Sequence, residues 1–347
     1  MHIIRPLAYL LLLCGCQTTE TKQQPHGPMD TTAKPLFVIA GQSNAEGNVR
    51  FIGFEALRDA LPSHHDSLST TEREALRTAY RDGVGDWCNP AEDYSVAAAD
   101  AAIDAFRASQ MDISQITSEY TVEGANMAAF RWYHQPAGED LAEPYENPSN
   151  SAHPAQTTQI APLGPGFGIW DNEETEVLFY GPEFGFGIRM DQSSTLGDFD
   201  VLKVAMGGSS LYEHWSPEGP LRQQLYEKTD AFLAQREGTS VQGLIWFQGF
   251  NDQFEDAHRN DYESNLTTLI TDFRLKYGED VPVVIVQARR IGDLDMIADA
   301  QQAVANSLPH IAIVESDGLT ECFHYDATSQ LVIGQRSADA MLQLHGQ

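Results

Sequence analysis

Short apolar runs alternate with helical patterns along most of this chain, and this rhythm constrains the fold more than any other feature. The apolar runs lie at residues 36–40, 201–205, 243–247, 283–287 and 311–314. Segments with helical patterns lie at residues 219–236, 262–276, 294–307 and 327–343. Buried parallel strands are near-continuous apolar runs, and helices connect them across the faces of the sheet. The pattern therefore predicts an α/β fold, a three-layer α/β/α sandwich with a doubly wound parallel sheet.

Residues 51–175 break this rhythm, and we expect them to form a large insertion after the first strand. The sequence predicts two helices there: one capped by Thr71, with Glu74 three residues later, and an Ala-rich one near 95–109. A loop rich in Pro, Asn, Ser and Gly follows from about 136 to 170. We expect the insertion to overhang the carboxyl edge of the sheet, where open α/β folds bind ligands. A separate domain is the alternative.

The N-terminal segment is typical of an export signal. Residues 1–5 are short and basic, and residues 7–13 are apolar but too few to span a bilayer as a helix. The next residues, Leu13-Cys14-Gly15-Cys16, resemble a bacterial lipobox in which Cys16 would carry the lipid. An ordinary signal peptide with incidental cysteines is the alternative.

This interpretation divides the chain into a lipoprotein signal peptide at 1–16, a flexible tether at 17–34 and a folded domain at 35–347. Residue 17 is Gln rather than Asp, so the resemblance implies an outer-membrane lipoprotein of the cell envelope. We expect the protein to meet the membrane through this anchor only and to be a monomer.

The charge balance excludes several partners. Acidic residues number 50 against 21 basic ones, which gives a formal net charge of −29. Such a surface repels nucleic acid and anionic membranes, so we expect neither to bind the folded domain. Cys88 and Cys322 could pair in an oxidising compartment, but no Cys/His spacing typical of zinc occurs. We expect no metal and no organic cofactor.

Four polar blocks lie at or shortly after the ends of the predicted strands. They are residues 41–45 (GQSNA), 206–210 (MGGSS), 246–252 (WFQGFND) and 321–326 (ECFHYD). Backbone N–H groups near a helix start favour negative charge, and paired glycines allow a ligand to approach the backbone closely. An amide such as Asn251 could donate to an oxyanion, and an acid three residues before a histidine can orient it. Each block alone is also compatible with a turn, a helix cap or a solvated histidine.

Together the four blocks resemble the SGNH hydrolases, in particular the branch of sialate O-acetylesterase-like and plant-type carbohydrate acetylesterases. The branch's Gly-Gln-Ser-Asn and Gly-Gly patterns occur in the first two blocks. The third block resembles the branch's Trp-x-Gln-Gly-(Glu)-x-Asp pattern, and its last four residues match the Gly-x-Asn-Asp pattern of the wider superfamily. Two departures stand out: Phe250 replaces a common Glu, and Glu321 replaces the Asp of Asp-x-x-His. Residues 181–187 resemble a further segment of this branch. The resemblance covers residues 35–50 and 178–343, and it implies the flavodoxin-like SGNH fold.

The resemblance also implies roles for individual residues. The catalytic residues would be Ser43 as nucleophile, His324 as base and Glu321 as acid. The oxyanion would be held by the backbone N–H of Ser43, a backbone N–H of Gly207 or Gly208, and Asn251. The substrate-binding candidates are Gln42, Gln248 and Glu183.

The acid has more than one candidate, because three carboxylates lie near His324 in the sequence. The family pattern selects Glu321. Asp326 is expected to cap the helix that begins near Ala327, and Asp317, next to Gly318, is expected in a turn.

The expected function is removal of O-acetyl groups from carbohydrate, an acetylated polysaccharide or a sialoside, through an acyl-enzyme. The alternatives are a lipase or thioesterase of the same fold and a non-catalytic glycan-binding lipoprotein. An α/β-hydrolase is disfavoured because no Gly-x-Ser-x-Gly elbow occurs. Aromatic residues of the insertion could stack on sugars or belong to the core, namely Trp87, Trp132 and Tyr133.

Overall fold

The computed structural model describes residues 33–47, 49–50, 68–83, 96–108, 122–126, 160–163, 179–193, 198–290, 292, 294–316, 318–319 and 324–346. The predicted signal peptide and nearly all of the predicted tether lie outside these residues, and so do both cysteines of the folded domain. The same is true of the three aromatic residues proposed for the insertion.

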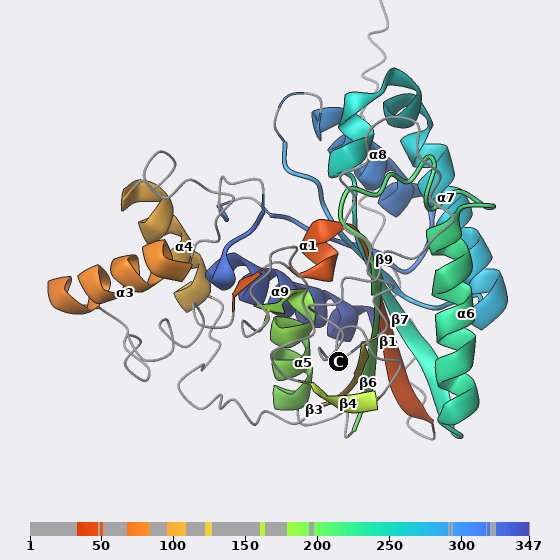
Figure 1. Cartoon of the computed structure of the whole chain (residues 1–347), viewed down its shortest axis with the longest axis horizontal. Coiled ribbons are helices and arrows are strands. Elements are labelled where there is room, and N and C mark those ends of the chain that lie inside the picture. The colour runs from red at the N-terminus through yellow and green to blue at the C-terminus, as the bar shows by residue number, and fades with distance from the viewer. Residues whose placement is uncertain are drawn as a thin grey trace, which may run out of the picture.

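A central sheet organises the fold and confirms the predicted class (Figure 1). Its strands are β4 (Ile160–Leu163), β3 (Val122–Asn126), β6 (Asp200–Ala205), β1 (Lys34–Gly41), β7 (Thr239–Phe247), β8 (Val283–Val286) and β9 (Ile311–Val314), in this spatial order. All neighbouring strands are parallel except the β3–β4 pair. The five predicted apolar runs thus form β1, β6, β7, β8 and β9.

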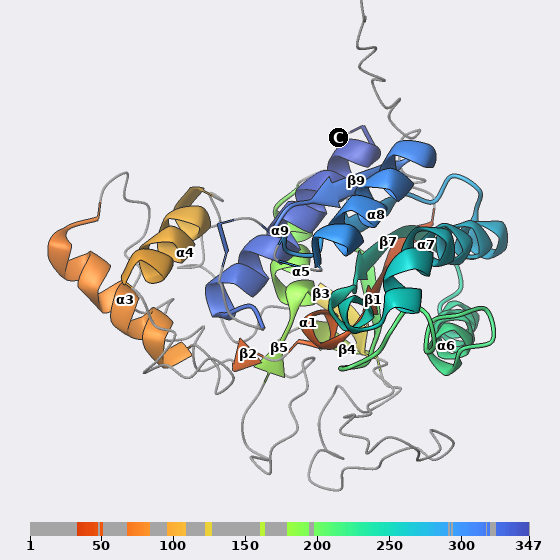
Figure 2. The ribbon, with the colours of Figure 1, turned by 90° about the horizontal axis from the view of Figure 1, so that it is seen from above.

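Helices cover both faces of the sheet. On one face lie α5 (Pro182–Gln192) and α9 (Ala327–Leu344), and on the other lie α6 (Pro220–Gln235), α7 (Asp256–Tyr277) and α8 (Leu294–Ser307) (Figures 1 and 2). Strand β1 serves both layers, because successive side chains point to opposite faces. Phe37 and Ile39 pack in the core beneath α5 and α9, whereas Leu36 and Val38 pack beneath α6, α7 and α8.

The described parts of residues 51–175 extend the sheet beyond the predicted strands. Strand β3 pairs with β6, and β4 pairs with β3. Helices α3 (Thr70–Gly83) and α4 (Val96–Ala108) pack against each other at one end of the molecule, and α4 also contacts α9 (Figure 2). Strands β3 and β4 are therefore part of the central sheet itself. The expected overhang of the carboxyl edge concerns residues outside the described ranges.

The predicted cap of the first insertion helix is wrong by two residues. Ser69 and Glu72 form the capping box: the Glu72 N–H donates to Ser69 Oγ, and the Ser69 N–H donates to Glu72 Oε2. The Thr71 and Glu74 pair has the same spacing, but both residues lie inside α3. Spacing alone therefore does not fix the start of a helix when two Ser/Thr–Glu pairs overlap.

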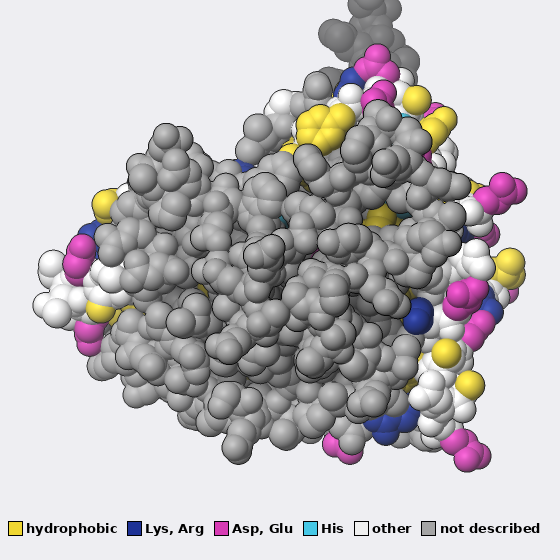
Figure 3. All heavy atoms as spheres, in the orientation of Figure 1, with side chains coloured by type: hydrophobic (Ala, Val, Ile, Leu, Met, Phe, Trp, Pro, Cys, Tyr) yellow, Lys and Arg dark blue, Asp and Glu magenta, His cyan; other side chains and the backbone are white. Residues whose placement is uncertain are grey.

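A small antiparallel pair links the two ends of the insertion. Strand β2 (Val49–Arg50) follows the first block and pairs with β5 (Phe179–Tyr180), which directly precedes α5. Among the described helices, none is long and apolar enough to cross a membrane. On the face seen in Figure 3, acidic side chains stand among basic and apolar ones along the edge where α6 and α7 lie.

Candidate active site

Three strand ends meet at the carboxyl edge of the sheet, and each carries one of the first three blocks. The Met206 N–H donates to the Gly41 carbonyl, and the Gln42 N–H donates to the Phe247 carbonyl, both at 3.1 Å. A Cβ on Gly41 would lie 2.1 Å from the Phe247 carbonyl oxygen, so this close approach requires glycine. The blocks after β1, β6 and β7 are thereby held against one another, as the topology of a doubly wound sheet predicts.

Ser43 and His324 lie within hydrogen-bond distance although 281 residues separate them: His324 Nε2 is 2.9 Å from Ser43 Oγ. Ser43 is the first residue of the short helix α1 (Ser43–Glu46), and His324 lies just before α9. Both side chains are buried, at 6% and 8% exposure. This is the geometry that a nucleophile and its general base need.

Asn44, to which the sequence analysis assigned no role, joins the two partners. Its Oδ1 accepts from the Tyr325 N–H at 3.2 Å, and its backbone carbonyl accepts from Gln330 Nε2 at 3.2 Å. The side chain next to the serine thus holds the backbone next to the histidine. Its place beside Ser43 in the Gly-Gln-Ser-Asn pattern was the available signal.

Burial lowers the pKa of His324 to about 4, because the interior disfavours the charged imidazolium. The imidazole is therefore neutral over the ordinary pH range, which is the form that can accept a proton from Ser43.

The two glycines of the second block differ in what their N–H groups do. The Gly207 N–H donates to Glu46 Oε2 at 2.9 Å. Gly208 has a φ of 71°, and its N–H donates to no atom of the described residues. Of the two glycines predicted to hold an oxyanion, Gly208 is the one with a donor to offer.

Asn251 lies in the short helix η4 (Phe250–Phe254), and its Nδ2 donates to the Gly208 carbonyl. A side-chain amide nitrogen carries two N–H donors, so this bond leaves a second one. The predicted role of Asn251 in an oxyanion hole is compatible with this arrangement, which also fixes the position of the Gly208 peptide.

Two predicted substrate-binding residues, Gln42 and Gln248, hold the backbone together. Gln42 Oε1 accepts from the N–H groups of Gly249 and Asn251, and no described residue accepts from its Nε2. Gln248 Nε2 donates to the Ser209 carbonyl at 3.0 Å and to Asp252 at 2.5 Å. Its Oε1 accepts from a tyrosine, so both ends of this amide are used. Gln42 alone retains a donor for a substrate.

The third predicted substrate-binding residue, Glu183, is not placed to bind a substrate. It is 1% exposed, and its Oε2 lies 2.9 Å from Lys203 Nζ in a buried ion pair. Its Oε1 accepts from the Gly181 N–H at the start of α5. A buried carboxylate needs a counter-charge and hydrogen bonds, and Glu183 uses its oxygens for this.

The fourth block is described in part. Glu321 and Asp317 lie outside the described residues, so neither is placed relative to His324. Asp326 caps α9, as predicted: its Oδ1 accepts from the Ser329 N–H at 2.7 Å. The predicted role of Asp326 as a helix cap is thus confirmed, and Glu321 and Asp317 stay the other candidates for the acid.

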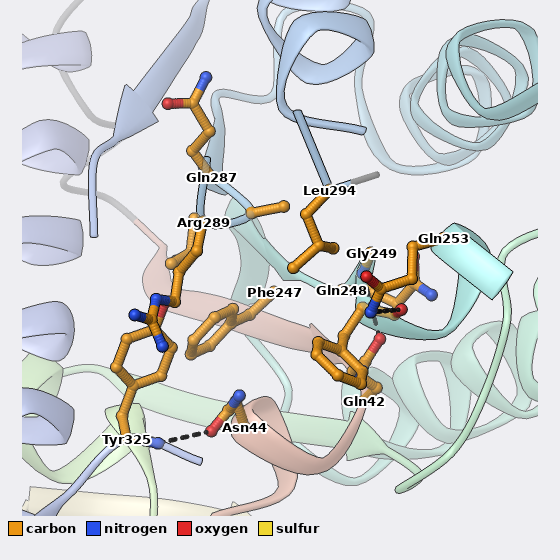
Figure 4. Close-up of a pocket in the computed structure, with 13 residues that line it drawn as sticks. Gln42, Asn44, Phe247, Gln248, Gly249, Gln253, Gln287, Arg289, Leu294 and Tyr325 are labelled. Carbon is orange, nitrogen blue, oxygen red and sulfur yellow. Dashed lines mark hydrogen bonds between the residues drawn. The ribbon is translucent and has the colours of Figure 1, made fainter. Parts of the chain in front are cut away.

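A pocket of about 290 Å³ opens beside the Ser43–His324 pair (Figure 4). It is bounded by Asn44 and Tyr325, the sequence neighbours of the pair, and its apolar wall includes Phe247, Phe250 and Leu294. Arg289 also lines it. In the part of the chain that the structure describes, no cluster of three or more His, Cys, Asp or Glu side chains could hold a metal ion.

Comparisons with known proteins identify the family of the chain. Residues 157–343, more than half of the chain, match the family described as "Carbohydrate esterase, sialic acid-specific acetylesterase". The "Probable carbohydrate esterase At4g34215" of Arabidopsis thaliana is 23% identical over 181 residues, which cover 50% of this chain and 67% of that protein.

Two solved structures share the fold. The structure of the Arabidopsis thaliana protein AT4G34215 has a TM-score of 0.54 at 15% identity and covers 90% of this chain and 98% of its own. The structure of NanS has a TM-score of 0.50 at 14% identity and covers 92% of this chain and 98% of its own.

The family match, together with the fold, defines the protein as a carboxylic ester hydrolase of the SGNH type. The chain belongs to the carbohydrate esterase family of sialic acid-specific acetylesterases, and the chemistry of this family is hydrolysis of O-acetyl esters on carbohydrate. The predicted superfamily, branch and enzyme class are thereby confirmed.

The lowered pKa of His324 predicts how kcat/KM depends on pH. If His324 acts as the general base, its neutral imidazole is the active form, and kcat/KM should fall as the pH drops through the pKa of His324 in the free enzyme. Because burial lowers this pKa to about 4, the acid limb should lie well below the ordinary histidine value of about 6.5. A pH profile of kcat/KM with a neutral acetate ester measures the position of the acid limb. An inflection at or above the ordinary histidine value of about 6.5 would contradict the prediction.

Proposed function

We propose that this protein removes O-acetyl groups from carbohydrate through an acyl-enzyme on Ser43, with His324 as general base. The observation that carries the proposal is the 2.9 Å distance between His324 Nε2 and Ser43 Oγ at the carboxyl edge of the sheet. A buried serine hydroxyl next to a neutral imidazole is the arrangement that nucleophilic catalysis of acyl transfer uses.

The proposed reaction has two steps. As Ser43 Oγ attacks the ester carbonyl, its proton passes to His324 Nε2, and the bond to the sugar oxygen breaks as His324 returns the proton to that oxygen. A water molecule then gives a proton to His324 and attacks the carbonyl carbon of the acetyl-serine. The bond between this carbon and Ser43 Oγ breaks as His324 returns the proton to Oγ, which restores the hydroxyl and releases acetic acid, ionised to acetate at neutral pH. The tetrahedral oxyanion would be held by the backbone N–H groups of Ser43 and Gly208 and by the second N–H of the Asn251 amide.

Glu321 remains the proposed acid of the triad. It lies three residues before His324, and Asp326, the carboxylate two residues after it, is used as a helix cap. A carboxylate near Nδ1 would orient the imidazole and stabilise the imidazolium that forms during the reaction.

The first prediction from this proposal concerns Ser43. The Ser43→Ala variant should fold normally and lose ester hydrolysis, because no other group supplies the nucleophile. Acetate release from acetylated polysaccharides, acetylated sialosides and 4-nitrophenyl acetate measures the loss. In the wild type, mass spectrometry after rapid acid quenching should find one acetyl group on Ser43. Ser337→Ala is the matched control: it also removes a buried serine hydroxyl, but from α9 rather than α1, and it should remain active.

The second prediction concerns the acid. Glu321→Gln should lower kcat by orders of magnitude, up to about 10⁴-fold, because the imidazole loses its orienting charge. The acid limb of the pH profile should also move lower, since a nearby carboxylate raises the pKa of an imidazole. Asp317→Asn should leave kcat near the wild-type value, and Asp326→Asn should change mainly the melting temperature. Loss of kcat in Asp317→Asn with a normal Glu321→Gln would assign the acid to Asp317.

The pocket supports a second candidate function, hydrolysis of esters with longer acyl chains. Its volume of about 290 Å³ exceeds what one acetyl group fills, and Phe247, Phe250 and Leu294 give it apolar walls. On the proposed function the same space receives part of the sugar. Arg289 on its lining would then favour a sugar that bears a carboxylate, such as a sialoside, because a guanidinium matches that group in charge and shape.

A chain-length series with a pocket-filling variant separates the two candidates. With 4-nitrophenyl acetate, butyrate and octanoate, kcat/KM should be highest for acetate. Leu294→Trp should weaken hydrolysis of an acetylated glycan while leaving 4-nitrophenyl acetate almost unchanged, because the added volume occupies the space proposed for the sugar. A preference for octanoate that Leu294→Trp abolishes would favour the longer-chain esterase.

A further inference from the structure

Glu46 is a buried carboxylate that neither the four blocks nor the proposed reaction uses. It is 3% exposed and lies three residues after Ser43, at the end of α1. Moving a carboxylate out of water is costly unless charges and hydrogen bonds compensate for it. Its position next to the nucleophile therefore calls for a function that depends on its oxygens.

One carboxylate oxygen of Glu46 holds the second block. Oε2 accepts from the Gly207 N–H at 2.9 Å, across 161 residues of sequence. A Cβ on Gly207 would lie 3.1 Å from this oxygen and 3.5 Å from Ser43 Cβ, so the turn lies directly against α1. The bond thus sets the distance between the nucleophile and the glycine turn.

A buried cation, Lys203, also binds helix α1. Lys203 Nζ donates to the Glu46 backbone carbonyl at 2.6 Å and lies 2.9 Å from Glu183 Oε2. Lys203 belongs to β6, the strand that leads into Gly207 and Gly208. The nucleophile helix and the glycine turn therefore share one support, and Lys203 also lies near the negative charge of Glu46.

The Gly207–Gly208 turn is held at two points, and these points determine which N–H remains available. Glu46 occupies the Gly207 N–H, and Asn251 Nδ2 donates to the Gly208 carbonyl. Between these bonds lies the Gly208 N–H, which donates to no atom of the described residues. The two bonds fix the Gly208 peptide in a backbone conformation with a φ of 71° that glycine adopts readily.

We propose that Glu46 is a positioning residue for the oxyanion hole: its carboxylate holds the Gly207 N–H and thereby aims the Gly208 N–H at the developing oxyanion. This inference rests on the proposed function, because it requires an oxyanion formed by attack of Ser43. Glu46 touches no reacting atom, so its effect should appear mainly in kcat, where a donor that acts in the transition state is felt.

The test compares Glu46→Gln with Glu46→Met. The two side chains have similar volume and both lack the charge, but only the glutamine can accept from the Gly207 N–H. We expect Glu46→Gln to keep kcat within a few-fold of the wild type. Glu46→Met should lower kcat about 10- to 100-fold with little change in KM. This decrease is smaller than the full loss of one oxyanion donor would cause, because the Gly208 N–H is misaligned rather than removed. Melting temperatures of both variants control for the shared loss of charge.

Equal kcat values in the two variants, whether normal or low, would overturn the inference, and so would a change confined to KM. If Glu46→Met does not fold, Glu46→Asp replaces it, because it keeps the charge but withdraws the acceptor by one methylene. Its kcat should then fall below that of Glu46→Gln, and the reverse order would overturn the inference. The Ser43→Ala variant distinguishes a failure of the Glu46 inference from a failure of the proposed function. If Ser43→Ala is active, both the proposed function and the Glu46 inference are wrong. If it is inactive, the proposed function stands whatever the Glu46 variants show.

Discussion

The close approach of β1 and β7 at Gly41 is the constraint on which the site depends. Any side chain there would collide with the Phe247 carbonyl, 2.1 Å from the position of a Cβ. With glycine, the end of β1 is hydrogen-bonded to both neighbouring strand ends, at Met206 and Phe247. The loops that follow these strands therefore start from fixed points, and Ser43, Gly208 and Asn251 reach one place without long flexible connections.

Buried amides then hold these loops in register. Gln42 accepts from two N–H groups of the third block, Asn44 holds the backbone beside His324, and Gln248 joins the second and third blocks. Loops at a strand edge contain many backbone groups that no sheet or helix satisfies, and leaving them unpaired inside the protein would be costly. A neutral amide can satisfy a donor and an acceptor at once without bringing a charge into the site. This explains why residues that resemble substrate ligands in the sequence serve largely as cross-links.

The sequence predicted the parts of the fold that local pattern controls. All five apolar runs are strands, and α8 begins and ends where its pattern does, at Leu294 and Ser307. By contrast, α7 begins at Asp256, six residues before the predicted start, because its first turns are polar and largely exposed. Strand β3 has the sequence VEGAN, which no strand pattern would select, and it exists because β6 offers it an edge. Among the site residues, the Ser43–His324 pair came from motif order, whereas the ion pair of Glu183 required tertiary structure.

Buried charged side chains next to the site also support the loops. A chain with a formal net charge of −29 nevertheless buries Lys203, with its ammonium 2.9 Å from the Glu183 carboxylate and near that of Glu46. A carboxylate close to an oxyanion would oppose its formation, and in a water-poor interior this repulsion is weakly screened. The lysine offsets that charge while the Glu46 carboxylate keeps its hydrogen bond to the glycine turn. A neutral acceptor would avoid the repulsion, but charge-assisted hydrogen bonds are shorter and stronger. The combination of Glu46 with Lys203 thus gives the turn a strong support while limiting the negative field that the reaction would meet.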